Sequence, residues 1–166
     1  RLKWFWYNIS LLRCKDFDET MDFINNNLDY YDSWYSVDGS LMFINRKKMT
    51  FEKIYKYASK YVYDEREFVS RLGYILLFMC DFKDEEIYEI EKLFHNDDKY
   101  YVQMAEAWLM CELVVKNPKC GYIVIERSPL KYNILSKAIQ KCQDSFRIDD
   151  EIKNNLKALR ESKKKN

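Results

Sequence analysis

The 166 residues carry 48% hydrophobic and 33% charged side chains, which excludes a disordered chain and allows a sizeable buried core. Only three glycines and two prolines are present, too few for the tight turns of a β-sandwich or barrel, so we expect an all-α fold. No apolar run approaches the roughly 18 residues of a membrane span, and we expect no membrane partner.

The net charge of +1 is unevenly distributed along the chain. Residues 1–60 have a net charge of +2, residues 61–115 of −8, and residues 116–166 of +7. A basic C-terminal third can face a polyanion such as a nucleic acid. The alternative is a solvated last helix that ends in a frayed basic tail at 163–166.

Cysteine and histidine usage argues against several catalytic classes. The five cysteines form no C-x-x-C pair, and we interpret them as free buried thiols of a cytoplasmic protein. The single histidine, His95, lies in the polar stretch HNDD, so we expect no metal site and no cofactor. The sequence offers no Ser/His/Asp triad, no phosphate-binding glycine loop and no Cys–His nucleophile pair.

The chain opens with an apolar stretch at residues 1–14, RLKWFWYNISLLRC, which is hydrophobic almost all round and lacks a capping residue. A helix here would leave tryptophans in water. We therefore expect a missing N-terminal portion of the domain, or a partner, to cover it.

Similar helix starts then recur along the chain. First helices are expected to open at Phe17, Thr50, Lys83 and Pro118, about 33 to 35 residues apart. Second helices are expected to open near Asp32, Asp64, Asp98 and Pro129, and Asp64 with Glu67 has the spacing of a capping box. A period near 33 residues with two helices per unit is typical of an α-solenoid. The sequence therefore predicts one domain, 1–166, built as an α-α superhelix (a HEAT-like solenoid) of antiparallel helix pairs. A plain helical bundle is the alternative.

The most apolar of the second helices is the stretch Tyr100–Pro118, YYVQMAEAWLMCELVVKNP. Its spacing gives two apolar stripes and leaves only Gln103, Glu106 and Met110 for a wetter side. We expect such a helix in the inner layer, with Trp108 near its middle, either in the core or facing a ligand.

Several blocks of the chain resemble the DNA alkylation repair family, the AlkD-type HEAT-like-repeat DNA glycosylases. Tyr100–Pro118 is similar to the family's YYV-x-M-A-x-AWL segment, and residues 137–147 are similar to its NKAIQK…ESxRV ending. Phe68–Phe78 resembles the family's arginine-bearing RF-x-x-V-x-LL helix, and Leu28–Ser33 falls where the family has W-x-x-x-D-S.

The resemblance implies an enzyme that binds duplex DNA on a concave surface and hydrolyses the N-glycosidic bond of N3- or N7-alkylated purines, without a cofactor. Asp32 matches the catalytic aspartate, which would stabilise the developing sugar cation and hold the attacking water. Trp108 matches an active-site tryptophan. The expected DNA contacts are Arg71, Trp34, Lys141 and Arg147.

One position departs from the family pattern. The other active-site tryptophan aligns with Leu28, which offers no aromatic face to a cation, and Trp34 or Tyr31 is a candidate replacement. Asp32 and Arg71 also have structural interpretations, as a helix N-cap and as an arginine that reaches the surface from an apolar face. Two functional alternatives therefore stay open: an inactive relative that binds DNA structures, and a protein-interaction scaffold.

Overall fold

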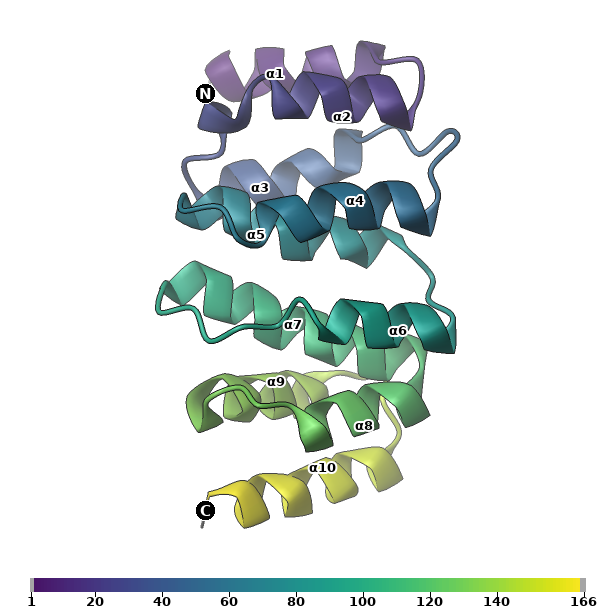
Figure 1. Cartoon of the computed structure of the whole chain (residues 1–166), viewed down its shortest axis with the longest axis vertical. Coiled ribbons are helices and arrows are strands. Elements are labelled where there is room, and N and C mark those ends of the chain that lie inside the picture. The colour runs from purple at the N-terminus through teal and green to yellow at the C-terminus, as the bar shows by residue number, and fades with distance from the viewer. Residues whose placement is uncertain (1, 165–166) are drawn as a thin grey trace. The chain divides into compact units, whose positions relative to one another are not determined.

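The computed structural model describes residues 2–164, and every regular element in this range is helical (Figure 1). The all-α class is confirmed. The first half contains α1 (Leu2–Arg13), α2 (Phe17–Asn25), α3 (Trp34–Ser40), α4 (Phe51–Tyr61) and α5 (Glu67–Leu76), with 3₁₀ turns η1 (Leu28–Tyr30), η2 (Leu41–Phe43) and η3 (Leu77–Met79). The second half contains α6 (Asp84–Glu91), α7 (Tyr100–Lys116), α8 (Pro118–Arg127), α9 (Tyr132–Asp144) and α10 (Asp150–Lys163).

The helix starts repeat at nearly constant intervals. Helices α2, α4, α6 and α8 begin at residues 17, 51, 84 and 118, which are 34, 33 and 34 residues apart. Helices α3, α5, α7 and α9 begin at residues 34, 67, 100 and 132, which are 33, 33 and 32 residues apart. The period of about 33 residues expected from the sequence is therefore present.

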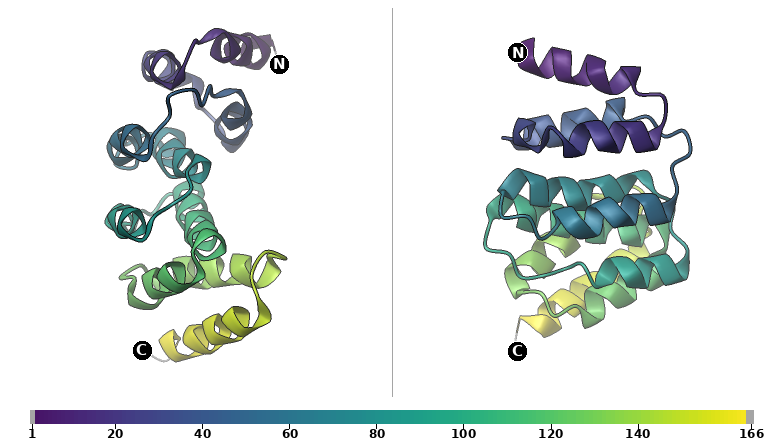
Figure 2. Two further views of the ribbon diagram at one scale, coloured as in Figure 1. Left: turned by 90° about the vertical axis from the view of Figure 1, so that its right-hand side faces the viewer. Right: turned by 45° about the horizontal axis from the view of Figure 1, so that its top comes forward.

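The chain divides into two compact units, one ending at Met79 and the other beginning at Cys80. In the first unit α5 packs against α3 and α4, and α1 packs against η2. Figure 2 shows α2 and α4 of this unit in one layer and α3 and α5 in another. In the second unit α7 packs against both α8 and α9, and α10 packs against the same two helices.

Two glycines allow neighbouring helices to approach closely. A Cβ at Gly73 of α5 would lie 2.7 Å from the backbone nitrogen of Val62. A Cβ at Gly121 of α8 would lie 2.4 Å from the backbone nitrogen of Val114. Both separations are shorter than real Cβ contacts, so any larger residue would push the helices apart.

Polar side chains also link consecutive helix pairs within each unit. The linked residues lie 33 to 36 positions apart, which is one repeat. They are Lys53 with Asp18 (2.5 Å), Asn117 with Asp84 (2.6 Å), Lys131 with Asp98 (2.9 Å), and Arg127 with Glu91. Consecutive pairs therefore pack in a similar register.

Several second helices begin differently from the sequence expectation. Ser33, and not Asp32, caps α3: its hydroxyl accepts the N–H of Ser36 (3.3 Å), and the Ser36 hydroxyl accepts the N–H of Ser33 (3.2 Å). Asp32 and Ser33 are both good capping types, and the helix starts one residue later than we expected. Helix α9 begins at Tyr132 and not near Pro129.

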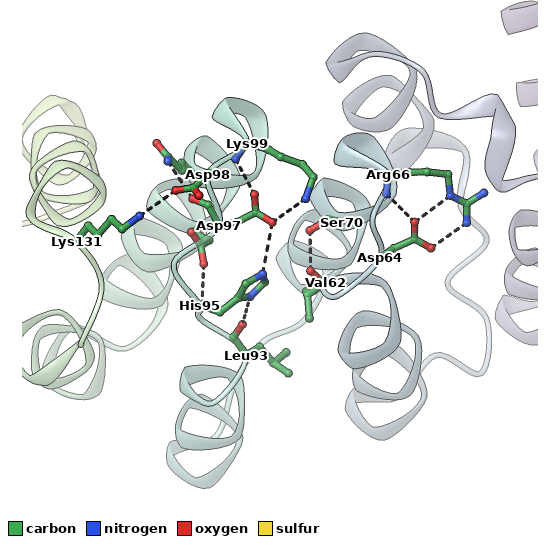
Figure 3. A network of polar contacts seen from close by, with 12 residues as sticks. Val62, Asp64, Arg66, Ser70, Leu93, His95, Asp97, Asp98, Lys99 and Lys131 are labelled. Atoms are coloured by element: carbon green, nitrogen blue, oxygen red, sulfur yellow. Dashed lines mark hydrogen bonds and ion pairs between the residues drawn. The ribbon is translucent and has the colours of Figure 1, made fainter.

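The expected capping box of Asp64 with Glu67 is replaced by a local turn (Figure 3). The Asp64 carboxylate accepts the backbone N–H of Arg66 (2.9 Å) and pairs with its guanidinium (2.8 Å). In the second unit Asp97 accepts the N–H of Lys99 (2.6 Å) and pairs with its ammonium (3.2 Å). The carboxylate of an aspartate two residues before a basic residue accepts that residue's backbone N–H and pairs with its charged side chain. These local contacts compete with capping of the helix.

The exposed side of α7 also differs from the prediction. Glu106 and Met110, expected on the wetter side, are fully buried. The Glu106 carboxylate faces the loop after α6, where it accepts the N–H of His95 (2.9 Å). Tyr100 and Trp108 are exposed instead. The prediction failed because residue polarity alone assigns every carboxylate to the solvent-facing side of a helix. A carboxylate that accepts a hydrogen bond from a backbone N–H is tolerated in the interior.

The two ends of the chain follow the sequence interpretation in part. Helix α1 exposes Trp6 to 61%, with Leu2, Phe5 and Leu12, while Trp4 is half-buried. Lys163 is the last residue of α10, so the tail expected at 163–166 begins inside a helix, and residues 165–166 lie outside the described range. Among the residues described, no helix is long and apolar enough to cross a membrane.

Candidate nucleic-acid interface

Helices α7 and α9 present a row of lysines over aromatic rings. The Lys141 ammonium lies 5.6 Å from the centre of the Trp108 ring, and Trp108 is 36% exposed. The Lys137 ammonium lies 5.0 Å from the centre of the Tyr100 ring. Lys137 and Lys141 are four residues apart on α9, and Tyr100 and Trp108 are eight apart on α7, so each pair shares a helix face. We call Tyr100, Trp108, Lys137 and Lys141 the lysine–aromatic row.

The row ends at a hollow of about 290 Å³, which brings together three of the residues singled out in the sequence: Trp108, Lys141 and Arg147. Glu112, 7% exposed, lies in its wall. The Arg147 guanidinium forms a two-pronged contact with the Glu112 carboxylate, with the Nη1 to Oε2 bond at 3.2 Å. The hydrogen bond from Arg147 to Glu112 raises the pKa of Arg147. The arginine is therefore held in place at the hollow, with its charge partly balanced.

A cysteine also lines this hollow. Cys111 faces Cys142 of α9, and both are free thiols. The hydrogen bond between the two thiols lowers the pKa of Cys111 and raises the pKa of Cys142. The sole histidine lies in the loop before α7, where its Nδ1 contacts the Leu93 carbonyl (3.1 Å) and its Nε2 lies 3.6 Å from Asp97.

Phe146 is an exposed aromatic residue that the sequence interpretation did not single out. It lies in the turn between α9 and α10, next to Arg147, and its side chain is fully exposed. A protruding aromatic ring beside a basic residue can stack on a nucleic-acid base. No local sequence signal separates it from a core phenylalanine, because the turn that exposes it is set by where α9 ends.

Arg71 of α5 forms an ion pair with Asp38 of α3. It is 5% exposed, and its guanidinium donates to the Asp38 carboxylate from Nε (2.9 Å) and Nη2 (2.7 Å). A contact between Arg71 and DNA stays a prediction, and it would have to compete with Asp38.

Asp32 lies on the loop before α3 and is exposed. Its carboxylate accepts a hydrogen bond from the Ser33 hydroxyl (3.3 Å). It lines a hollow of about 350 Å³ together with Trp4, Tyr30 and Tyr35. Burial, with a smaller effect of Tyr31, raises the pKa of Tyr30 to about 12. These aromatic neighbours of Asp32 were not expected.

The suggested aromatic replacements for the family tryptophan occupy other places. Leu28 lines a separate hollow of about 670 Å³ beside Trp6. Tyr31 is buried, and its hydroxyl accepts a hydrogen bond from Tyr7 (3.1 Å). Trp34 is half exposed and contacts Tyr35 edge-on, with ring centres 6.1 Å apart.

No family model, curated protein or solved structure matches the chain. The resemblance to the DNA alkylation repair family therefore depends on the sequence blocks alone. Within the described part of the chain, no group of three or more His, Cys, Asp or Glu side chains is arranged to hold a metal ion.

Proposed function

We propose that the chain is a HEAT-like helical-repeat protein of the DNA alkylation repair type, which binds duplex DNA through the lysine–aromatic row. The observation that carries this proposal is the common position of Trp108, Lys141 and Arg147 at one hollow. Lysines supply the salt-dependent attraction to phosphates, and exposed rings supply stacking surface.

A solenoid of antiparallel helix pairs is part of this proposal. It is supported by the period of about 33 residues in both sets of helices and by the side-chain links one repeat apart within each unit. In a solenoid each pair contacts only its neighbours, so compact units can end between any two pairs. A cytoplasmic location is supported by five free, buried cysteines, which suit a reducing compartment.

The reaction that we propose is hydrolysis of the N-glycosidic bond of an alkylated purine. Alkylation makes the base cationic and a good leaving group, so the enzyme mainly has to stabilise positive charge on the sugar and hold a water molecule. Asp32 is an exposed carboxylate beside aromatic rings, which is a setting that favours a developing cation.

A second candidate, a DNA-binding relative without excision activity, is favoured by Leu28 and Arg71. Leu28 lines a different hollow from Asp32, and Arg71 is engaged by Asp38. A protein-interaction scaffold would leave the lysine–aromatic row without a nucleic-acid ligand.

Duplex binding is tested by fluorescence anisotropy of a labelled duplex at low salt. We expect the double variant Lys137→Gln/Lys141→Gln to bind at least about tenfold more weakly than the wild type, since it loses two phosphate contacts. The matched control is Lys153→Gln/Lys157→Gln, which removes two lysines with the same spacing on α10 and should change affinity little. Equal losses for the two double variants, or no binding by the wild type, would overturn the proposal.

A further inference from the structure

Two cysteines of the second unit are neighbours across the contact between α7 and α9. Cys111 of α7 and Cys142 of α9 share a hydrogen bond, and both are free thiols. Their helices pack against each other within the unit that begins at Cys80. The two sulfurs are therefore within reach of each other in the folded chain.

Other thiols of the chain lie beside groups that cannot form a disulfide. The Cys14 thiol donates to the Ser10 carbonyl (3.5 Å), and the Cys120 sulfur accepts the Tyr88 hydroxyl (3.7 Å). Both of these cysteines are buried, like Cys111. Burial alone therefore does not distinguish Cys111, but a second thiol as its neighbour does.

Cys111 also has a route to the solvent. It lines the hollow of about 290 Å³ together with Trp108 and Arg147. Trp108 is 36% exposed and the Arg147 side chain is 59% exposed, so the hollow is open to water. A water molecule takes up about 30 Å³, and hydrogen peroxide is larger by one oxygen atom, so it fits. Cys142 is fully buried, and an oxidant that enters the hollow meets Cys111 first.

The surroundings of Cys111 favour its thiolate, which is the nucleophilic form of a cysteine. The hydrogen bond with Cys142 lowers the pKa of Cys111 most, and burial and Glu112 oppose this effect. The positive charges of Arg147 and Lys141 lower the pKa further. The same hydrogen bond, together with burial, raises the pKa of Cys142. Cys111 is therefore the sulfur that attacks, and Cys142 is the thiol held next to it.

We propose that Cys111 and Cys142 are an oxidation site, at which a hydroperoxide converts the two thiols into a disulfide between α7 and α9. A reachable cysteine beside a second cysteine that can resolve it is the arrangement found in thiols that respond to oxidants. In a reducing compartment such a bond is transient, because thiol exchange restores the two thiols. This inference concerns the thiols alone and does not depend on DNA binding.

The reaction has two steps. The Cys111 thiolate attacks one oxygen of hydrogen peroxide, the O–O bond breaks, hydroxide leaves, and the cysteine becomes a sulfenic acid. The Cys142 sulfur then attacks the Cys111 sulfur, the S–O bond breaks, and the thiol proton leaves with the hydroxyl group as water. The two sulfurs lose two electrons in total, and these reduce the peroxide.

A structural metal ion is a poor alternative for the same pair. Zinc in a structural site takes four ligands, and two thiols supply half of them. Among the residues that the structure describes, His, Cys, Asp and Glu side chains form no group of three or more that could hold a metal.

The test is treatment of the reduced full chain with a small excess of hydrogen peroxide, followed by alkylation of the remaining thiols in denaturant and mass spectrometry. We expect two of the five thiols to resist alkylation, the mass of the chain to fall by two hydrogen atoms, and digestion to yield one peptide pair joined through Cys111 and Cys142. Reduction with dithiothreitol should restore all five thiols.

Three variants assign the roles of the two sulfurs. Cys111→Ser should slow the peroxide-dependent loss of thiols about tenfold or more, because it removes the attacking thiolate. Cys142→Ser should stop at the sulfenic acid, which dimedone captures at Cys111. Cys120→Ser is the matched control, since it removes another buried cysteine of the same unit, and it should leave the disulfide unchanged.

The peptide map of the wild type decides the matter even if a variant fails to fold. Absence of the Cys111–Cys142 peptide pair would overturn the inference, as would loss of all five thiols at one common rate or a disulfide that joins two chains. Capture of the sulfenic acid at a cysteine other than Cys111 would also contradict it.

Discussion

Replacing Asp38 with alanine tests whether the ion pair between Arg71 and Asp38 stabilises the fold. The Arg71 guanidinium is 5% exposed and makes two hydrogen bonds to Asp38, at 2.9 and 2.7 Å. Removing one partner of a buried ion pair typically costs about 3–5 kcal/mol, because the remaining charge has lost its counter-ion. The Asp38 side chain is 24% exposed, so we expect the lower end, about 3 kcal/mol. For a chain of this length that loss lowers Tm by about 6–12 °C.

The assay is urea unfolding followed by circular dichroism, with Asp18→Ala as the matched control. Asp18 forms a similar link with Lys53 at 2.5 Å, but both side chains are substantially exposed, so the loss should stay below about 1 kcal/mol. The double variant Asp38→Ala/Arg71→Met should recover much of the lost stability. If Asp38→Ala costs no more than Asp18→Ala, Arg71 is not held by Asp38, and a role in contacting DNA becomes the better interpretation.

Three further predictions concern packing, pH dependence and the hollow at α7. Gly121→Ala should lower the free energy of unfolding by about 2–3 kcal/mol, because the added Cβ would meet the Val114 backbone. Gly39→Ala is the control and should cost much less, because its Cβ would meet only a side chain, at 3.4 Å. Equal losses of stability for the two variants in urea unfolding would contradict this. The hydrogen bond from Arg66 lowers the pKa of Asp64 below its usual range. This carboxylate therefore stabilises the fold above about pH 4, and its contribution is lost as the pH falls through the lowered pKa. The urea midpoint of Asp64→Asn should fall less steeply with decreasing pH than the midpoint of the wild type. Glu112→Gln removes the charge that balances Arg147, so the slope of log affinity against log salt concentration should steepen by about 0.9. Between about 50 and 200 mM salt, the variant should therefore lose about 3.5-fold more affinity for the duplex than the wild type loses. An unchanged slope would show that Arg147 does not contact DNA.

The sequence predicts the helices and their period well, because both are set locally. Caps, proline at the start of α8 and apolar spacing all act within a few residues, and Pro118 and the capping Thr50 mark helix starts that the structure contains. Second-helix starts are shifted, since Asp64 and Asp97 have basic residues two positions on and form turns instead of caps.

Residues singled out in the sequence come together only where they lie on, or next to, neighbouring helices of the repeat. Trp108, Lys141 and Arg147 meet because α7 and α9 are neighbours in the repeat, which the period already implies. Trp4 and Tyr35 were missed because their contact joins residues 31 positions apart through the packing of α1, and no local pattern reports it. The burial of Arg71 depends likewise on Asp38, which has no signature of its own.

The most direct test of the proposed reaction is the release of 7-methylguanine from methylated duplex DNA, measured by chromatography of the free base. We expect the wild type to release the base and Asp32→Asn, which keeps the size of the side chain and removes its charge, to release little or none while still binding the duplex. Binding without release by the wild type would contradict hydrolysis and leave the DNA-binding relative as the function.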